Sequence, residues 1–187
     1  LTHGSLFSGI GGFELGAKEA GIETIWSCEY EQFNRDILKK NFPNTKQYEN
    51  IIGMEIPEYV DIISGGFPCQ DYSVAKTLNS SKGLRGKKGV LWWEILRLVQ
   101  AQKPKFIFLE NVDRLLKSPS SQRGRDFAVM LRTLGEEGYT IEWRVVNAAE
   151  YGFPQRRIRV FIVATKIRRN TKKMSPEEIQ NLFLSKP

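Results

Sequence analysis

Short apolar runs alternate with amphipathic stretches along this chain, and that alternation constrains its fold more than any other feature. The strand-like runs are His3–Phe7, Thr24–Cys28, the short Thr45–Gln47, Val60–Ser64, Lys105–Glu110, Ile141–Asn147 and Ile158–Thr165. The helix-like stretches are Gly12–Ala20, Phe33–Asn41, Leu91–Gln102 and Asp126–Glu137. Strands that alternate with helices predict an α/β fold, with a mostly parallel sheet and helices on both of its faces.

Composition limits what such a domain can be. The chain has 187 residues, which is enough for one sizeable domain with a core of its own. No apolar run is long enough to cross a bilayer, and no stretch resembles a signal peptide. Two distant cysteines, Cys28 and Cys69, and a single histidine, His3, argue against a disulfide framework and against a metal site. We therefore expect a cytoplasmic protein without a metal.

Basic residues are in excess and gather in clusters. The net charge is +7 and the isoelectric point is about 9.4. The clusters are Lys82, Arg85, Lys87 and Lys88; Arg156, Arg157 and Arg159; and Lys166–Lys173. A solvated basic surface is the simplest interpretation of such a charge. The clustering favours a face that contacts phosphates, and so a polyanionic partner.

A glycine-rich loop follows the first strand and leads into the first helix. Its sequence, Phe7–Gly12, gives the backbone freedom to turn sharply where the helix presents unpaired N–H groups. Glu29 ends the second strand, where a carboxylate can accept hydrogen bonds from ribose hydroxyls. Phe7 is a core residue by type, and its place also suits a wall for an adenine ring. The loop is not GxGxxG, which disfavours a nicotinamide oxidoreductase.

A cysteine stands where α/β folds place their ligands. The segment Gly65–Gln70 follows the fourth strand, and Cys69 lies at the start of a long polar loop, Asp71–Lys88. A single cysteine is most often a small buried side chain. This position makes Cys69 a candidate nucleophile, and loops of this length in compact domains are usually functional.

An acid and two arginines are expected at the same edge. Glu110 closes the fifth strand, so it is either a strand-end cap or an acid/base group beside Cys69. Arg157 and Arg159 share one face of the last strand and suit a pyrimidine carbonyl, a phosphate or a carboxylate. The alternative is that these charges only protect a sheet edge from aggregation.

Taken in order, these residues resemble the DNA cytosine-5 methyltransferase family, in its bacterial modification-methylase form. The matching stretches are Phe7–Gly12, Glu29, Gly66–Gln70 with Ser73, Gly89–Leu91, Glu110–Val112 and Gln155–Arg159. The resemblance implies a Rossmann-like methyltransferase fold that uses S-adenosylmethionine. It places the catalytic and cofactor-binding domain in residues 1–165. Residues 166–187 would be a basic linker or the start of a missing target-recognition region.

The family's chemistry assigns a role to each reactive side chain. Cys69 would add to C6 of cytosine, so that C5 attacks the methyl group of the cofactor. Glu110 would engage N3 and the exocyclic amine, with Arg157 helping to ionise the thiol. Arg159 would contact the O2 side or orient Glu110. The base must leave the duplex first, with the loop Asp71–Lys88 as the clamp over it.

The resemblance also names binding residues. Those expected around the cofactor are Phe7, Gly9, Gly11, Gly12, Glu29, Tyr30, Asn50, Ile51, Pro68 and Leu91. Those expected on double-stranded DNA are Gln70, Ser73, Lys82, Arg85, Lys87 and Lys88. Two positions depart from the family pattern. Tyr30 replaces a frequent Trp and can still stack on adenine, and Asn50 replaces an Asp and can still accept one hydrogen bond.

The family continues with a target-recognition domain and a final segment that completes the cofactor pocket, and neither is visible here. We therefore expect a fragment, or one subunit of a split enzyme with the recognition region on a separate chain, inactive alone. One alternative is the branch that methylates cytosine in tRNA, although Cys69–Ser73 does not match that branch's pattern. Another is a non-catalytic piece that binds cofactor or DNA.

Overall fold

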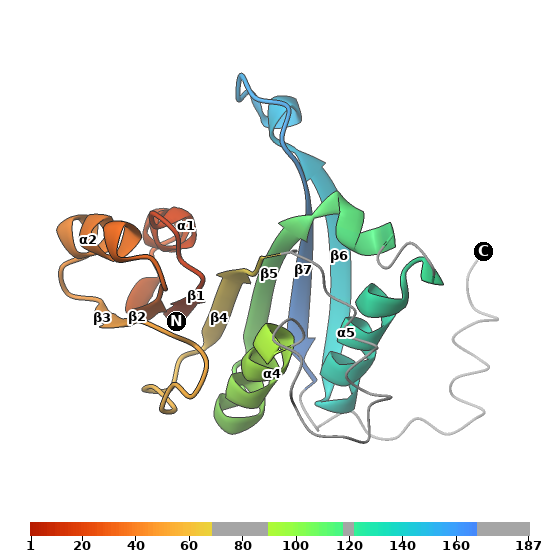
Figure 1. Ribbon diagram of the computed structural model, residues 1–187, viewed down its shortest axis with the longest axis horizontal. Helices are drawn as coiled ribbons and strands as arrows, with labels where there is room; N and C mark the ends of the chain where they lie inside the picture. The colour runs from red at the N-terminus through yellow and green to blue at the C-terminus, as the bar shows by residue number, and fades with distance from the viewer. Residues whose placement is uncertain (69–89, 118–121, 168–187) are drawn as a thin grey trace, which may run out of the picture.

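The computed structural model describes residues 1–68, 90–117 and 122–167, and within them seven strands form one sheet in the order β3-β2-β1-β4-β5-β7-β6 (Figure 1). The strands are β1 (Thr2–Leu6), β2 (Glu23–Cys28), β3 (Lys46–Tyr48), β4 (Ile62–Gly66), β5 (Phe106–Val112), β6 (Tyr139–Asn147) and β7 (Ile158–Lys166). The helices are α1 (Gly12–Glu19), α2 (Gln32–Asn41), α4 (Val90–Gln102) and α5 (Arg125–Glu136), with short 3-10 turns η1 (Asp113–Lys117) and η3 (Ala148–Tyr151).

The sheet is parallel from β3 to β5, and its strand order reverses between β1 and β4. The chain builds β1, β2 and β3 outward in one direction and then returns to place β4 on the other side of β1. β7 lies antiparallel between β5 and β6. A reversal of this kind opens a crevice at the carboxyl ends of the flanking strands, where α/β folds bind ligands.

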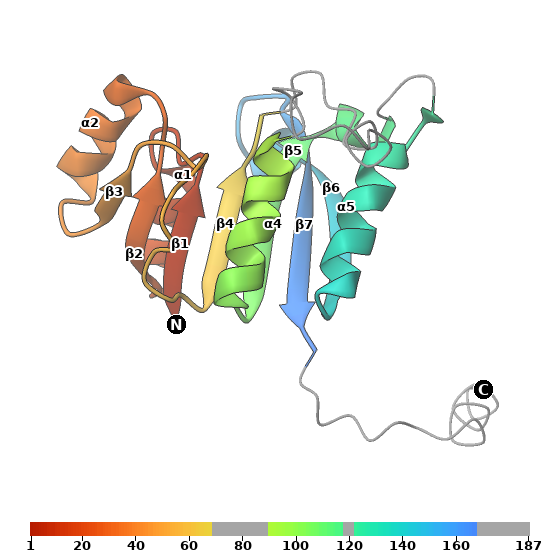
Figure 2. The same ribbon diagram turned by 60° about the horizontal axis from the view of Figure 1, so that its bottom comes forward.

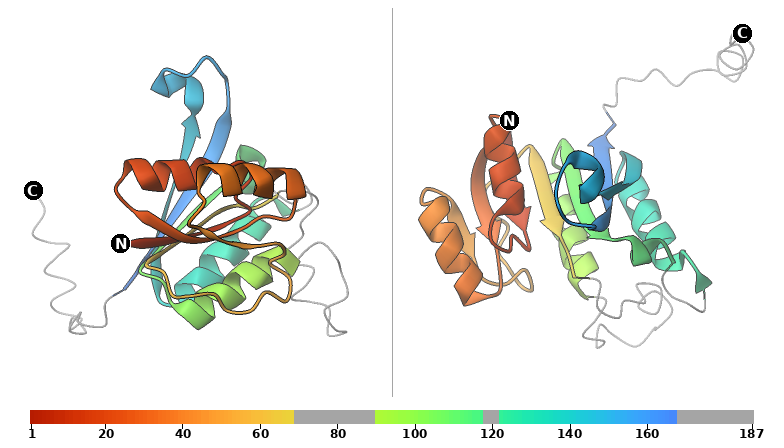
Figure 3. Two further views of the ribbon diagram at one scale, coloured as in Figure 1. Left: turned by 90° about the vertical axis from the view of Figure 1, so that its left-hand side faces the viewer. Right: turned by 90° about the horizontal axis from the view of Figure 1, so that it is seen from above.

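Helices cover both faces of this sheet. Figure 3 shows α1 and α2 on one face, whereas Figure 2 shows α4 and α5 side by side on the other. The core gathers alternate residues of β5 and β7 with the inner faces of α4 and α5; among them are Ile107, Leu109, Val160, Ile162, Ile95, Leu98, Met130 and Leu134. The predicted α/β fold, a mostly parallel sheet between two helical layers, is confirmed.

Every strand and helix expected from the sequence is present, with ends that differ by a few residues. The last strand begins at Ile158 as expected, so Arg157, which was expected to share a face of that strand with Arg159, precedes it. Its first ladder pairs join Ile158 to Asn147 and Arg159 to Val112, where both partner strands end. The start of β7 therefore coincides with the ends of its two partner strands, β5 and β6. The turns η1 and η3 were not predicted.

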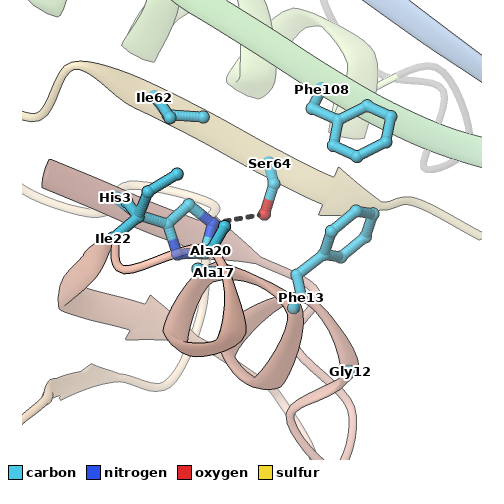
Figure 4. A pocket seen from close by; sticks show the side chains of 10 residues that line it. His3, Gly12, Phe13, Ala17, Ala20, Ile22, Ile62, Ser64 and Phe108 are labelled. Atoms are coloured by element: carbon cyan, nitrogen blue, oxygen red, sulfur yellow. Dashed lines mark hydrogen bonds between the residues drawn. The ribbon is translucent and has the colours of Figure 1, made fainter. Parts of the chain in front are cut away.

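An apolar groove lies beside α1 on the face that α1 and α2 share. It encloses about 370 Å³, and its walls include Phe13, Ile22, Ile62 and Phe108 (Figure 4). Phe13 packs edge-on against Phe108, which in turn lies 5.6 Å from the ring of Phe161. In the right-hand view of Figure 3, α1 and α2 do not extend over β5 and β7, whereas η3 and the β6–β7 connection are drawn over them.

The base of the groove holds a buried histidine that joins three strands. His3 on β1 bonds through Nδ1 to the Thr24 hydroxyl at 2.8 Å and through Nε2 to the Ser64 hydroxyl at 2.7 Å. The side chain is 2% exposed. Burial penalises the charged ring and lowers the pKa of His3 to about 4.

His3 therefore makes folding sensitive to acid. Between pH 6.5 and 4 the unfolded chain binds a proton at this ring and the folded chain does not, so stability falls as the pH is lowered through that window. The loss reaches at most about 3 kcal/mol. Urea unfolding of the wild type and a His3→Gln variant at several pH values measures the difference. Equal pH dependence in both proteins would show that His3 does not contribute.

Candidate functional site

The glycine loop after β1 has a backbone that few other sequences could adopt. Phe7, Gly9 and Gly11 all have positive φ, of 54°, 56° and 99°. At Gly11 a side chain is also excluded by space, because a Cβ atom there would lie 2.6 Å from the ring of Phe42. Gly11 is the residue before α1, so these glycines set the direction in which the helix leaves the sheet.

Glu29 closes this loop from the neighbouring strand. Its Oε2 accepts the Gly9 N–H at 2.7 Å, and its Oε1 accepts the Glu31 N–H at 2.9 Å and the Asn34 amide at 3.3 Å. The residue is 8% exposed. Three donors satisfy the charge of a buried carboxylate and fix its orientation. The group predicted to bind ribose is therefore held rigidly against the glycine loop.

A cavity of about 400 Å³ opens beside this loop. Its walls are Phe7, Cys28, Tyr30, Glu49, Asn50, Ile51, Ile52, Pro68 and Leu91. The structure thus brings together six residues expected around the cofactor, namely Phe7, Tyr30, Asn50, Ile51, Pro68 and Leu91. The other four expected residues, Gly9, Gly11, Gly12 and Glu29, are not among its walls, and Gly12 lines the groove beside α1 instead. Asn50 accepts the Ile52 N–H at 2.9 Å, which turns the chain at the cavity wall.

Two arginines that the sequence did not single out hold the walls of this cavity. Arg35 on α2 donates to the carbonyl oxygens of Glu29 and Tyr30. Arg97 on α4 donates to the carbonyl oxygens of Ile51 and Met54, at 3.4 and 2.9 Å. Arg35 reaches carbonyls five and six residues before it, whereas Arg97 reaches carbonyls more than 40 residues away, a contact that no local motif could have indicated.

The second cluster lies at the carboxyl edge of β4 and β5. Gly66 pairs with Glu110 across the two strands. Oε1 of Glu110 lies 2.7 Å from Nε of Arg159 and 4.0 Å from a terminal nitrogen of Arg157. The acid and the two arginines, expected at the same edge, lie close together there, although Arg157 precedes β7. Gly66 leaves room for Glu110, since a Cβ there would lie 3.1 Å from its Oε2.

An asparagine ties this edge to the segment that leads to the cysteine. The buried Asn111 donates its amide to the carbonyl oxygen of Phe67 at 2.9 Å. Phe67 and Pro68 end the described part of this segment. The expected nucleophile Cys69 lies outside the described residues, as do the expected DNA contacts Gln70, Ser73, Lys82, Arg85, Lys87 and Lys88.

A further cavity of about 280 Å³ adjoins Glu110. It is lined by Glu110, Arg157 and Arg159 together with Val146, Ala148, Tyr151, Phe153 and Phe161. Tyr151 and Phe153 are largely exposed and belong to the β6–β7 connection, which projects above the sheet in Figure 1. The sequence did not indicate that Tyr151 and Phe153 line this cavity, because their place depends on how the β6–β7 connection folds. The cavity is large enough to admit an aromatic ring beside the acid and the two guanidinium groups.

Comparison with known proteins identifies the family of this chain. The model of the C-5 cytosine-specific DNA methylases matches residues 1–186. The chain belongs to this family. It is 52% identical over 174 residues to the type II methyltransferase M.Sau3AI of Staphylococcus aureus, covering 86% of this chain and 42% of that protein. It is 32% identical to M.HhaI of Haemophilus parahaemolyticus, covering 97% of this chain and 52% of that protein.

Solved structures show the same fold. A protein described as a DNA modification methyltransferase of an E. coli prophage superposes with a TM-score of 0.71 at 25% identity, over 95% of this chain and 49% of that one. DNMT2 of Spodoptera frugiperda gives a TM-score of 0.71 at 20% identity, over 94% and 53% of the two chains, which shows the fold alone. The chain therefore spans about half the length of the relatives that it matches.

S-adenosylmethionine is the methyl donor of the C-5 cytosine methylases. The residues present fit such a molecule, because an anchored carboxylate, a glycine loop and an apolar cavity lie side by side. Within the described residues, no three potential metal ligands gather. No helix there is long and apolar enough to span a membrane.

Replacing Glu29 tests the expected cofactor site. Glu29→Ala removes the expected ribose acceptor, and a hydrogen bond to a charged group contributes about 1.5–3 kcal/mol. The dissociation constant for S-adenosylmethionine should rise roughly ten- to a hundredfold in calorimetry. Glu23→Ala, at the exposed start of the same strand, is the matched control. An unchanged constant for Glu29→Ala would reduce that residue to a strand-end charge.

Proposed function

We propose that this chain is the catalytic and cofactor-binding part of an enzyme that transfers a methyl group from S-adenosylmethionine to C5 of cytosine in DNA. The observation that carries the proposal is the pairing of Glu110 with Arg159 directly opposite Gly66. Gly66 begins the short segment that leads to Cys69. Pro68, in the same segment, lines the expected cofactor cavity. Glu110, the two arginines, the expected cofactor cavity and the residues that precede Cys69 in the sequence thus lie toward one sheet edge, which supports the proposal.

The proposed reaction begins at Cys69. Its thiolate forms a bond to C6 of the cytosine, and the displaced electron pair makes C5 nucleophilic. C5 then takes the methyl group from the sulfonium centre, which the cofactor supplies as an electrophile. A water molecule or hydroxide removes the C5 proton, and the electron pair of that bond expels the thiolate from C6. The cytosine ring is restored with one methyl group in place of one proton.

Glu110 and the arginines would stabilise the charge that develops on the ring. Glu110 is in position to meet N3 and the exocyclic amine of a base seated in the adjoining cavity. Arg159 fixes the Glu110 carboxyl at 2.7 Å and presents positive charge on the same side. Arg157 is half exposed and lines the same cavity, and we assign it the role of helping to ionise the Cys69 thiol. A base in this cavity must have left the duplex.

Double-stranded DNA is the proposed partner, and the basic excess supports it. The net charge of +7 and the exposed Arg156 and Arg157 suit a phosphate backbone. Gln70, Ser73 and the Lys82–Lys88 cluster would add contacts from the clamp. We assign residues 1–165 to the catalytic domain and 166–187 to a linker or the start of a recognition region. A DNA substrate also favours a cytoplasmic location.

The rest of the enzyme would supply recognition of the DNA sequence, in the same chain or on a second one. Two observations support a missing part. The chain spans about half the length of its relatives. An apolar groove, with Phe108 in its wall exposed at 36%, also lies beside α1 (Figure 4). Apolar surface of this kind is stabilised when another segment packs on it.

Replacing the cysteines separates the proposed nucleophile from its structural counterpart. In the complete enzyme, Cys69→Ser should abolish methyl transfer and covalent trapping on 5-fluorocytosine DNA, with cofactor affinity nearly unchanged. Cys28→Ala is the control, because Cys28 is buried in β2 and burial raises the pKa of its thiol to about 12. Its loss should cost a few kcal/mol of stability at most. Normal turnover by the Cys69 variant would exclude the assignment.

The chain by itself should bind DNA in a salt-sensitive and sequence-blind manner, with negligible methylation. Base extrusion requires a duplex held from both sides, and these residues supply one side. Adding the remaining part of the enzyme, fused or as a second chain, should restore methylation in a radiolabel assay. Assays on DNA and on tRNA in parallel distinguish the two substrate classes. Robust sequence-specific methylation by the 187 residues alone would contradict the proposal.

A further inference from the structure

A turn that follows β3 forms one wall of the cavity expected to hold the cofactor. Its residues Glu49–Ile52 all line that cavity, and Asn50 accepts the Ile52 N–H at 2.9 Å. The turn closes where the Met54 N–H donates to the Ile51 carbonyl at 3.2 Å. These residues belong to no helix or strand, so contacts with other elements fix their position.

Arg97 on α4 holds this turn by its main chain. One terminal nitrogen of Arg97 donates to the carbonyl oxygen of Met54 at 2.9 Å and to that of Ile51 at 3.4 Å. The Ile51 carbonyl therefore accepts two N–H groups, one from within the turn and one from the helix. Because each peptide group is planar, fixing these carbonyls also fixes the direction of the main chain beside Asn50.

The guanidinium group is itself oriented by an acid one turn earlier on the same helix. Oε2 of Glu94 lies 2.8 Å from Nε of Arg97 and 2.8 Å from the terminal nitrogen that holds the turn. Leu91, near the start of α4, lines the cavity directly. This helix thus contributes one part of the cavity wall by its own side chain and holds a second part through Arg97.

Stability of the fold gives little reason for this arginine. The side chains of Ile51 and Met54 are buried in the core and already anchor the turn by apolar contacts. The side chain of Arg97 is 36% exposed, and a partly exposed ion pair between neighbouring turns of a helix adds little to stability. What the arginine adds is a fixed main-chain geometry at the wall of the cavity.

We propose that Arg97, oriented by Glu94, is a positioning residue for cofactor binding, which holds the turn so that Asn50 meets the adenine end of the cofactor. This rests on the proposed function, because it assumes that the cavity binds S-adenosylmethionine. Without the arginine, Asn50 would still be present, but its position would vary. Part of the binding free energy would then be used to order the turn, and the affinity would fall.

Four proteins test the proposal: Arg97→Gln, Asn50→Ala, the double variant of both, and Arg132→Gln as the matched control. Arg132 pairs with Glu136 on α5 and is 79% exposed, so its replacement removes a helical ion pair away from the cavity. Calorimetry gives the dissociation constant for S-adenosylmethionine and the number of binding sites per chain, and thermal unfolding gives stability. Arg97→Gln should bind roughly tenfold more weakly with an unchanged number of sites. Arg132→Gln should follow the wild type.

The double variant separates positioning from an independent contribution. If Arg97 acts through the turn, its support of a side chain that is already deleted costs little to remove. The double variant should therefore bind about as weakly as the weaker of the two single variants. Glu94→Ala should lower the affinity roughly threefold, because the guanidinium group keeps its carbonyl partners and loses only its orientation.

Three outcomes would overturn this role. One is a folded Arg97→Gln protein with the wild-type dissociation constant. Another is fewer binding sites at an unchanged constant, which marks a residue needed only for folding. The third is a double variant in which the two losses multiply in full. If Arg97→Gln does not fold, Glu94→Ala decides in its place, and wild-type affinity there would exclude the role. A wild type that binds no cofactor would instead refute the proposed function, and the inference with it.

Discussion

The parallel register of β1, β4 and β5 is the constraint on which the rest of the site depends. Leu6 pairs with Gly65, and Gly66 pairs with Glu110, so the three strands end together at one edge of the sheet. The loops that follow them therefore emerge side by side, although they begin about 60 and 45 residues apart in sequence, a separation closed by the crossover connections of the fold. A slip of one residue in β5 would turn Glu110 to the opposite face.

The antiparallel insertion of β7 completes this edge. A strand in the parallel direction would start at the opposite end of the sheet and carry its first residues away from the loops. Because β7 runs the other way, its start lies where β5 ends, and Arg159 pairs with Val112. Arg159 then lies within 2.7 Å of Glu110 from the adjacent strand. The antiparallel direction of β7 therefore brings the positive charge of Arg159 to Glu110.

Three carboxyl groups near this edge differ in their burial and in their hydrogen-bond partners. Glu29 is buried and satisfied by three N–H donors, which stabilises its charge. Glu110 is partly exposed and paired with arginine, which leaves one oxygen available beside a cavity. Glu14 is buried without a partner, which favours its neutral form. Glutamate side chains near one sheet edge can therefore differ in burial, in hydrogen bonding and in the ease with which they carry charge.

The sequence by itself determined the elements, the sheet class and the order of the motifs. Periodicity and glycine position are local properties, and Phe7–Gly12, Glu29 and Glu110 each end or follow a strand that a local pattern defines. Only the tertiary structure decided which distant groups meet. The support that Arg97 gives to main-chain carbonyls, the approach of Arg159 to Glu110 and the burial of Glu14 all depend on packing between elements. A contact between residues distant in sequence leaves no pattern in a single chain, because either side chain alone fits many other surroundings.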